Sequence, residues 1–311
     1  MGVNAVSALS LGEGSTPLVP ARRLQERFGV ELHLKCDGLN PTGSFKDRGM
    51  VVAVERAAQS GARAVVCAST GNTAASAAAY AARAGLEAIV LTPAGATATA
   101  KRAQARAAGA RLLEVKGSFD DALRLCRELG QREGFVLVNS LNPDRIEGQK
   151  SVVVEILEQL GAAPGLIALP FGGGGNVSAV AAGLADAGAS TRIVVGQAAE
   201  RATTWASAIR IGEPAHAEHV AALVDDGRVE VVTLGENELR GAWQLLSHEE
   251  GVFCEPASAA GVAALERLSD LEGTTVVCIV TGHGLKDAGA VDDGESQTVE
   301  ATLEAVLEAI G

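Results

Sequence analysis

The run Pro41-Thr42-Gly43-Ser44-Phe45-Lys46-Asp47-Arg48 places one lysine between a Gly/Ser turn and an alanine-rich segment with helical character. A free ε-ammonium is a poor nucleophile, but a lysine desolvated near other cations becomes an amine that can form an imine with a carbonyl group. In the first turn of a helix the dipole disfavours its positive charge, which a structural role would not explain. Lys46 is therefore our candidate for covalent attachment of pyridoxal 5'-phosphate (PLP), although the run alone also fits a surface lysine that opens a helix.

A glycine-rich loop, Phe171-Gly172-Gly173-Gly174-Gly175-Asn176, follows an apolar run and precedes a helical one. Backbone N–H groups at the start of a helix form an anion site, and a phosphate is the natural ligand. A dinucleotide-binding loop would have Gly or Ala where this chain has Val177, and an acidic residue about 20 positions further on, where this sequence is apolar. A P-loop would need Gly-Lys-Ser/Thr, which is absent. We predict a phosphate site at this loop.

Two other polar segments are candidates for binding acidic groups of a substrate. The segment Ser69-Thr70-Gly71-Asn72-Thr73 offers hydroxyls, an amide and free N–H groups that suit a carboxylate, although it also fits an ordinary helix cap. Further on, Asn139, Ser140 and Arg145 combine an amide, a hydroxyl and a guanidinium, which together fit carboxylate or phosphate oxygens.

The last apolar run ends in Thr281, whose hydroxyl could hydrogen-bond a ring nitrogen. In the Gly-rich turn after it, His283 fits a packing or hydrogen-bonding role better than that of a general base. The other histidines show no metal-binding spacing such as His-Glu-x-x-His. We therefore predict no metal site.

Short apolar runs alternate with longer alanine-rich segments, and this predicts an α/β protein with mostly parallel sheets. The expected strands are 32–35, 64–68, 88–92, 111–115, 135–138, 166–169, 192–197, 229–234 and 275–280. The expected helices are 47–59, 72–84, 97–108, 119–129, 146–160, 176–187, 203–211, 237–250, 257–268 and 299–310. The candidate loops all follow carboxyl ends of strands, where open α/β sheets bind ligands. Each is a weak signal alone, but together they predict one site.

Composition excludes several classes of protein. The chain has 311 residues, enough for two domains that each bury a core. A formal net charge of −12 argues against nucleic acid as a partner. No apolar run approaches the ~20 residues needed to cross a bilayer, and 1–18 lacks the pattern of a secretory signal, so we expect a cytoplasmic protein with no membrane partner. Five widely spaced cysteines favour buried, reduced thiols over disulfides.

Taken together, these segments resemble threonine synthase, one of the fold-type II PLP enzymes, which include tryptophan synthase β and the serine/threonine dehydratases. The resemblance covers nearly the whole chain and includes 13–18, 40–49, 68–85, 139–150, 255–260 and 281–287. The lysine segment is shared among these enzymes. The runs 142–150, Asn-Pro-Asp-Arg-Ile-Glu-Gly-Gln-Lys, and 281–287, Thr-Gly-His-Gly-Leu-Lys-Asp, look specific to threonine synthase.

The resemblance implies how a cofactor would be held. Lys46 would attach PLP covalently and, once released from it, would move protons at Cα, Cβ and Cγ of the substrate. Phe45 would pack beside the cofactor, and Asn72 would bind its 3'-oxygen. Thr281 would face the pyridine nitrogen. The phosphate of PLP would be bound by the loop that contains Gly172, Gly173, Gly174, Gly175 and Asn176.

The resemblance also implies the substrate, an amino acid, and the reaction. O-phospho-L-homoserine and water would give L-threonine and phosphate by γ-elimination and β-addition, the work of a PLP-dependent carbon–oxygen lyase in threonine biosynthesis. The residues implied in substrate binding are Ser69, Thr70 and Thr73 for the carboxylate, and Asn139, Ser140 and Arg145 for the phosphate.

The implied architecture is two open, mostly parallel α/β domains with PLP in the cleft between them. The large PLP-binding domain would comprise 1–46 and 142–311, and the small mobile domain 47–141. The small domain would close on the substrate and exclude water until the addition step. A homodimer is also implied by the resemblance.

The glycine loop departs from the pattern of the family, and Ala96 stands where many of its members have lysine. The family loop reads Val-Gly-Asn-Ala-Gly-Asn, with its first asparagine near the substrate phosphate, and this chain has Gly173 there. A hydrogen bond to a charged group is worth about 1.5–3 kcal/mol, so the loss would weaken phosphohomoserine binding roughly ten- to a hundredfold unless another donor compensates. The glycine run looks like that of the dehydratases. Two alternatives therefore stay open: a dehydratase-like lyase or β/γ-replacement enzyme on another amino acid, and a catalytically silent amino-acid-binding protein, which the intact lysine disfavours.

Overall fold

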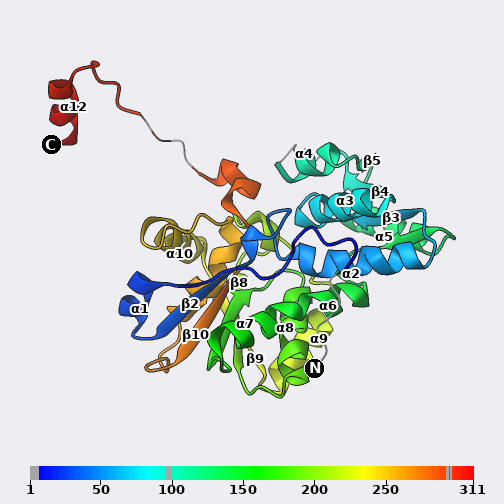
Figure 1. Cartoon of the computed structure of the whole chain (residues 1–311), viewed down its shortest axis with the longest axis horizontal. Helices are drawn as coiled ribbons and strands as arrows, with labels where there is room; N and C mark the ends of the chain where they lie inside the picture. The colour runs from blue at the N-terminus through cyan, green and yellow to red at the C-terminus, as the bar shows by residue number, and fades with distance from the viewer. Residues whose placement is uncertain (1–6, 96–99, 292–293, 295) are drawn as a thin grey trace.

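The computed structural model describes residues 7–95, 100–291, 294 and 296–311. It contains two separate sheets (Figure 1), with the strand orders β1-β2-β10-β7-β8-β9 and β5-β4-β3-β6. Neighbouring strands are parallel except β1, which pairs antiparallel with β2. The strands are β1 (Leu18–Pro20), β2 (Glu31–Cys36), β3 (Ala64–Ala68), β4 (Glu87–Pro93), β5 (Arg111–Val115), β6 (Phe135–Leu137), β7 (Leu166–Pro170), β8 (Arg192–Ala198), β9 (Val229–Leu234) and β10 (Thr275–Val280).

Each sheet is covered by helices on both faces, which is why its central strands are apolar without alternation. On the six-stranded sheet, α1, α10 and α11 pack on one face and α7, α8 and α9 on the other. On the four-stranded sheet, α2, α3 and α4 pack on one face and α5 on the other. The helices are α1 (Arg22–Phe28), α2 (Lys46–Gln59), α3 (Asn72–Ala84), α4 (Ala100–Ala107), α5 (Phe119–Gly130), α6 (Pro143–Gln149), α7 (Ser151–Leu160), α8 (Gly175–Asp186), α9 (Ala217–Asp225), α10 (Glu236–His248), α11 (Ala260–Leu265) and α12 (Leu303–Ile310).

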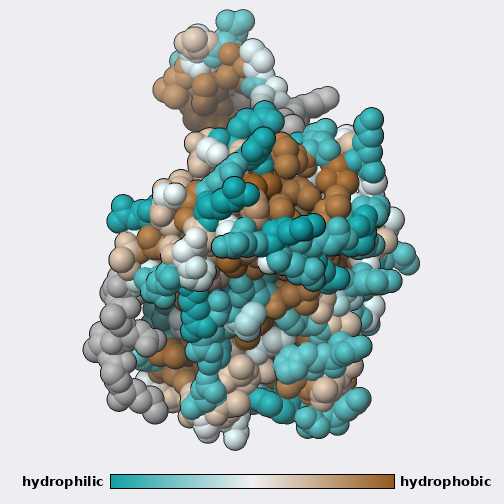
Figure 2. All heavy atoms as spheres, turned by 90° about the vertical axis from the view of Figure 1, so that its right-hand side faces the viewer, coloured by the Kyte–Doolittle hydropathy of each residue, from teal (hydrophilic) through white to brown (hydrophobic). Residues whose placement is uncertain are grey.

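We call the six-stranded sheet with its helices the larger lobe, and the four-stranded sheet with its helices the smaller lobe. The chain builds β1 and β2 of the larger lobe, then the whole smaller sheet, and returns to the larger lobe with β7. Beyond the larger lobe, α12 stands apart from the rest of the molecule in Figure 1. The exposed side chains of Leu303, Leu307 and Ile310 lie on this helix, and its hydrophobic surface is visible at the top of Figure 2.

All nine predicted strands are confirmed, each within one residue at either end. The short β1 was missed, because three residues that end in proline give no strand signal of their own and depend on pairing with β2. The helix expected at 146–160 is two helices, α6 and α7. The first of them, α6, begins earlier than expected. The side chain of Asn142 caps it by accepting the N–H of Asp144, and Pro143 opens its first turn.

The prediction of a helix at 203–211 was wrong, because the regular structure there is a single 3₁₀ turn, Ser207–Ile209. The hydroxyl of Thr204 accepts the N–H of Ala206 at 3.2 Å, and such a bond competes with the helical pattern. The expected 257–268 helix starts as the 3₁₀ turn Pro256–Ala259 and continues as α11, while α1 and α9 were not expected. Of the helix expected at 97–108, residues 97–99 lie outside the described residues. The expected 299–310 helix begins at Leu303, after the cap of Thr302.

Candidate active site

The crossing of α2 and α6 sets the position of Lys46 relative to Arg145. A Cβ on Gly49 would lie 2.3 Å from the backbone oxygen of Arg145, and one on Gly148 would lie 2.2 Å from the backbone oxygen of Arg48. Only glycine permits this approach from both sides. The two backbones therefore touch one helical turn or less from Lys46 and from Arg145.

Lys46 begins α2, and its Nζ lies 4.3 Å from the centroid of the Phe45 ring. Burial, and next the positive charge of Arg145, lowers the pKa of Lys46 to about 7, against the opposing charge of Glu255. An amine with that pKa is substantially neutral at physiological pH. It can therefore act as a nucleophile and can both accept and give up a proton.

The Arg145 side chain is fully buried, and only one of its nitrogens has a partner among the described residues. Nη1 donates to the backbone oxygen of Val138 at 2.9 Å, whereas Nε and Nη2 have no partner among the described residues. Burial lowers the pKa of Arg145 to about 10. A buried guanidinium with unused donors is costly unless an anion completes its hydrogen bonds. Its surroundings thus fit the predicted role in anion binding.

Asn72 begins α3 and faces a carboxylate that the sequence analysis did not single out. Its Nδ2 donates to Glu255 Oε1 at 2.8 Å, and its Oδ1 has no partner among the described residues. Nζ of Lys101 lies 3.0 Å from the other oxygen of Glu255. Glu255 stands in one of the motif segments, so it could have been noticed, whereas Lys101 carries no signal in the sequence. The structure shows no side-chain cap at this helix start, so the reading of 69–73 as an ordinary helix cap was wrong.

The glycine loop is held by its carbonyl groups. The backbone oxygen of Gly172 accepts Nη2 of Arg201 at 2.7 Å, and that of Gly173 accepts the N–H of His216 at 3.1 Å. In a planar trans peptide the N–H points opposite to the C=O, so the N–H groups that follow these two carbonyls face the other way. Gly174 has φ +87°, and α8 starts at the next residue. The loop thus has the geometry of an anion-binding turn at a helix N-terminus.

The end of β10 lies against the lysine segment. The N–H of Phe45 donates to the backbone oxygen of Thr281 at 2.9 Å, and the Thr281 hydroxyl lies 3.0 Å from that of Ser258. Nδ1 of His283 accepts the N–H of Leu285 at 3.1 Å, as expected for a hydrogen-bonding histidine. Thr281 and Phe45 are therefore brought together with Lys46, as the sequence predicts.

The remaining polar segments meet at adjacent strands β3 and β6. The side chain of Asn139 exchanges two hydrogen bonds of 2.9 Å with the backbone of Ala68, the last residue of β3, which leaves one amide N–H for a ligand. In the loop that follows β3, the Ser69 hydroxyl accepts the N–H of Gly71 at 3.0 Å. The backbone oxygen of Ser140 accepts Nε2 of His216 at 2.9 Å. This last contact joins the 139–145 segment to the glycine loop.

Comparison with known proteins now decides the family. A family model described as "Pyridoxal-phosphate dependent enzyme" matches residues 9–282. Threonine synthase from Halalkalibacterium halodurans is 46% identical over 301 residues, which cover 90% of this chain and 84% of that protein. Threonine synthase from Mycobacterium leprae is 45% identical over an alignment of 327 positions, which covers 97% of this chain and 91% of that protein. This chain belongs to the threonine synthase family of PLP-dependent enzymes.

Solved structures show the same fold at low identity. Cysteine synthase from Entamoeba histolytica superposes with a TM-score of 0.80 at 20% identity, over 96% of each chain. Maize serine racemase superposes with a TM-score of 0.75 at 24% identity, over 95% of this chain and 91% of that one. The prediction of a fold-type II PLP enzyme is confirmed.

The residues of this threonine synthase family member fit PLP on structural grounds. The amine of Lys46 has a lowered pKa, the glycine loop presents a helix N-terminus, and the Thr281 hydroxyl ends a buried strand. Most of the buried side-chain atoms without a hydrogen-bond partner in the described residues belong to the candidate segments or to residues in contact with them: Ser44 Oγ, Asn72 Oδ1, Arg145 Nε and Nη2, Asn176 Nδ2 and Glu255 Oε2. Buried polar atoms are seldom left unpaired in a folded protein, so this concentration is typical of a ligand site.

Other expectations concern the rest of the chain. All five cysteines are free and buried, as predicted. Within the described residues, no helix has both the length and the apolar character needed to cross a membrane. The same part of the chain contains no group of three or more His, Cys, Asp or Glu residues suited to a metal ion.

Proposed function

We propose that this protein is a threonine synthase that converts O-phospho-L-homoserine and water into L-threonine and phosphate. The observation that carries the proposal is the pairing of the Lys46 amine, with a pKa of about 7, and the buried Arg145, with unused donors, in a chain of this family. The first group supplies an amine for proton transfer, and the second supplies a site for an anionic leaving group.

In this proposal each loop has one task. Lys46 would hold PLP, with Phe45 packed beside it, Thr281 at the ring nitrogen, Asn72 at the 3'-oxygen and the loop 172–176 on the phosphate. When bound, PLP supplies an electron sink for carbanions next to the amino-acid Cα. The amine of Lys46 would then accept and return protons at Cα, Cβ and Cγ of the substrate.

The substrate would be oriented at both ends. Ser69, Thr70 and Thr73 would donate to its carboxylate from the loop at the start of α3. Arg145, Ser140 and the remaining N–H of Asn139 would bind its phosphate, so that the γ C–O bond breaks with the negative charge already neutralised. Water would then add at Cβ.

We also propose the division of the chain into 1–46 with 142–311 and the insert 47–141. The two sheets support it, since β3, β4, β5 and β6 all fall inside the insert. Closure of the insert on the larger lobe would exclude water before the addition step. We further propose a cytoplasmic homodimer, which light scattering on the purified protein would test by its mass.

An assay with the purified holoenzyme tests the reaction directly. We expect threonine and inorganic phosphate in equal amounts from O-phospho-L-homoserine, and little keto acid from serine or threonine. The second candidate function, a dehydratase-like lyase, is favoured by Gly173 and the glycine run around it. Keto acid from serine or threonine, with no phosphate release from phosphohomoserine, would favour this second function and reject the first.

A further inference from the structure

The glycine at position 173 leaves space that no side chain of its own fills. Among the described residues, a Cβ built on Gly173 would have one atom within 4 Å, Ile211 Cδ1 at 3.6 Å. The backbone therefore does not require glycine at this position, in contrast to Gly174, where a Cβ would lie 2.9 Å from Cβ of His216. If the substrate carries a phosphate, some other donor must serve where a side chain at 173 would reach.

His216 contacts both the glycine loop and the segment that carries Ser140. Its backbone N–H donates to the oxygen of Gly173 at 3.1 Å, and its ring reaches past the glycine loop so that Nε2 lies 2.9 Å from the backbone oxygen of Ser140. A Cβ on Gly175 would lie 3.7 Å from His216 Nε2 and 3.7 Å from Ser140 Cβ. His216 thus lies where the glycine loop meets the segment that carries Ser140 and Arg145.

The tautomer follows from the acceptor. A carbonyl oxygen has no proton to give, so the proton of this hydrogen bond is on Nε2. In this tautomer the one N–H of the neutral ring is donated to Ser140, so a phosphate oxygen beside Ser140 would share this N–H or take it over. Arg201, a cation beside the loop, is a weaker candidate, because its hydrogen bonds in the described residues go to Gly172, Ile211 and Gln197 and none of them reaches the segment that carries Ser140 and Arg145.

We propose that His216 is a specificity-determining residue that donates a hydrogen bond to the phosphate of the substrate in place of the amide missing at position 173. The ligand class is a phosphate monoester on an amino acid, and the inference rests on the proposed function. When the phosphate binds, the imidazole N–H would either turn from the Ser140 carbonyl to an oxygen of the phosphate or be shared between these two acceptors. No bond is made or broken in this step.

The test uses holoenzyme, in which PLP already occupies its own phosphate site. The variants are His216→Ala, His216→Gln, which keeps a donor, and the double variant Gly173→Asn with His216→Ala, which restores an amide at 173. The matched control is His219→Ala, an exposed histidine on α9. Each protein is assayed for KM and kcat with O-phospho-L-homoserine, and for binding of inorganic phosphate by titration calorimetry. The visible band of bound PLP reports cofactor content.

We expect His216→Ala to raise KM for phosphohomoserine and the Kd for inorganic phosphate roughly tenfold or more, with kcat changed less and PLP content unchanged. His216→Gln and the double variant should regain most of both affinities, and His219→Ala should match the wild type. A purely structural role would lower the melting temperature of His216→Ala without rescue by Gly173→Asn. Such a result, or an unchanged phosphate Kd in His216→Ala, would overturn the proposal.

The two proposals fail in different ways. If the wild-type holoenzyme makes no threonine from phosphohomoserine, the proposed function is rejected. The phosphate titration still decides whether His216 contributes to an anion site. If threonine is formed and the titration shows no effect of His216, only the role of His216 is rejected.

Discussion

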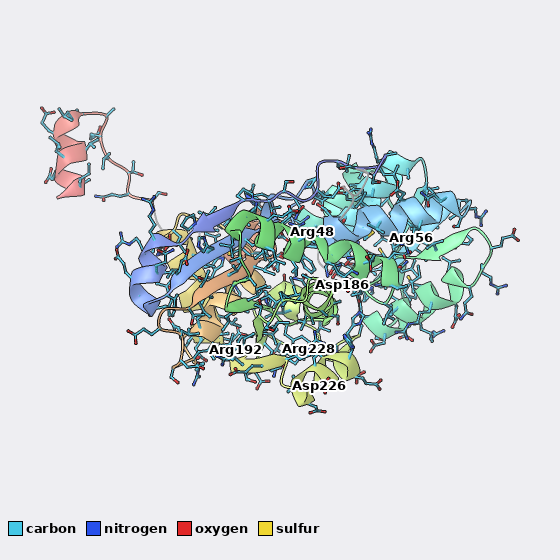
Figure 3. All side chains as sticks on the ribbon, turned by 60° about the horizontal axis from the view of Figure 1, so that its bottom comes forward. Arg48, Arg56, Asp186, Arg192, Asp226 and Arg228 are labelled. Carbon is cyan, nitrogen blue, oxygen red and sulfur yellow. The ribbon has the colours of Figure 1, made fainter. Side chains whose placement is uncertain are left out.

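Two buried arginines on crossing helices show how this protein separates structure from function. Arg48 on α2 donates to both oxygens of Asp37, at 2.8 and 2.9 Å, and to both oxygens of Glu155, at 2.6 and 2.8 Å. Arg145 on α6 makes one hydrogen bond to a backbone oxygen and has no carboxylate in an ion pair within the described residues. Figure 3 shows Arg48 where α2 meets the green helices of the larger lobe, with Arg56 farther along α2.

The electrostatic environments of the two guanidinium groups differ in the same way. Burial disfavours the charge of Arg48, but the Asp37 charge and the hydrogen bonds of Glu155 outweigh this and raise its pKa. At Arg145 burial prevails and lowers the pKa to about 10. A cation that holds the fold together is neutralised within the protein, whereas a cation left without an anion is available to a ligand. Substitutions should therefore separate stability from activity.

Arg145→Met should have the largest effect, and it should be on activity. Two unused donors to a phosphate are removed, and we expect kcat/KM for O-phospho-L-homoserine to fall by at least about a hundredfold. Unfolding in urea should show a free energy equal to that of the wild type or higher, because an incompletely paired buried charge is lost. Normal activity, or a loss of activity that merely follows a loss of stability, would contradict the comparison.

Arg48→Met should affect stability instead. It leaves Asp37 and Glu155 near each other without their shared cation, and breaking a buried ion pair in this way costs about 3–5 kcal/mol of unfolding free energy. The exposed Arg27, which pairs with Glu266 on the surface, provides the matched control, since Arg27→Met should cost about 1 kcal/mol or less. Equal losses in the two variants would show that the Arg48 network does not stabilise the fold.

The pH dependence of stability should show the same network. Burial would raise the pKa of Glu155, but Arg48 and Lys35 lower it to about 2, below its unfolded value near 4.5. Because the folded pKa is the lower one, the stabilisation is present above pH 4.5 and is lost as the pH falls toward 2. In Glu155→Gln the free energy of unfolding should vary less over this range. If the free energy of unfolding varied with pH in the same way in the wild type and in Glu155→Gln, Glu155 would not be the source of this pH dependence.

The smallest expected effect is on the pKa of Lys46, which should depend on Arg145 and not on Arg48. In protein freed of PLP, the pKa of Lys46 measured by the pH dependence of its acylation should lie near 7. Arg145→Met should raise that pKa, since it removes a nearby positive charge. Arg48→Met should leave it unchanged, as Arg48 is not among the groups that shift Lys46. Mass spectrometry of the Lys46 peptide would follow the reaction, and a rise of equal size in both variants would contradict the assignment.

The sequence predicted the parts of the site that are local. Lys46, the glycine loop and Thr281 each stand at the end of a recognisable element, so their spacing along the chain reports their place in the fold. Contacts between distant segments were not predictable in this way. Asn72 meets Glu255 across 183 residues, and His216 meets Ser140 across 76. The α2–α6 crossing likewise depends on Gly49 and Gly148, which carry no chemistry of their own and matter only once the two helices are packed.

The central claim is that the amine of Lys46 holds PLP. Borohydride reduction of the purified holoenzyme, followed by digestion and mass spectrometry, tests it most directly. We predict a pyridoxyl adduct on Lys46, with no adduct in Lys46→Ala and with Lys101 and Lys286 unmodified. Recovery of unmodified Lys46 from protein that carries PLP, or an adduct on another lysine, would contradict the account.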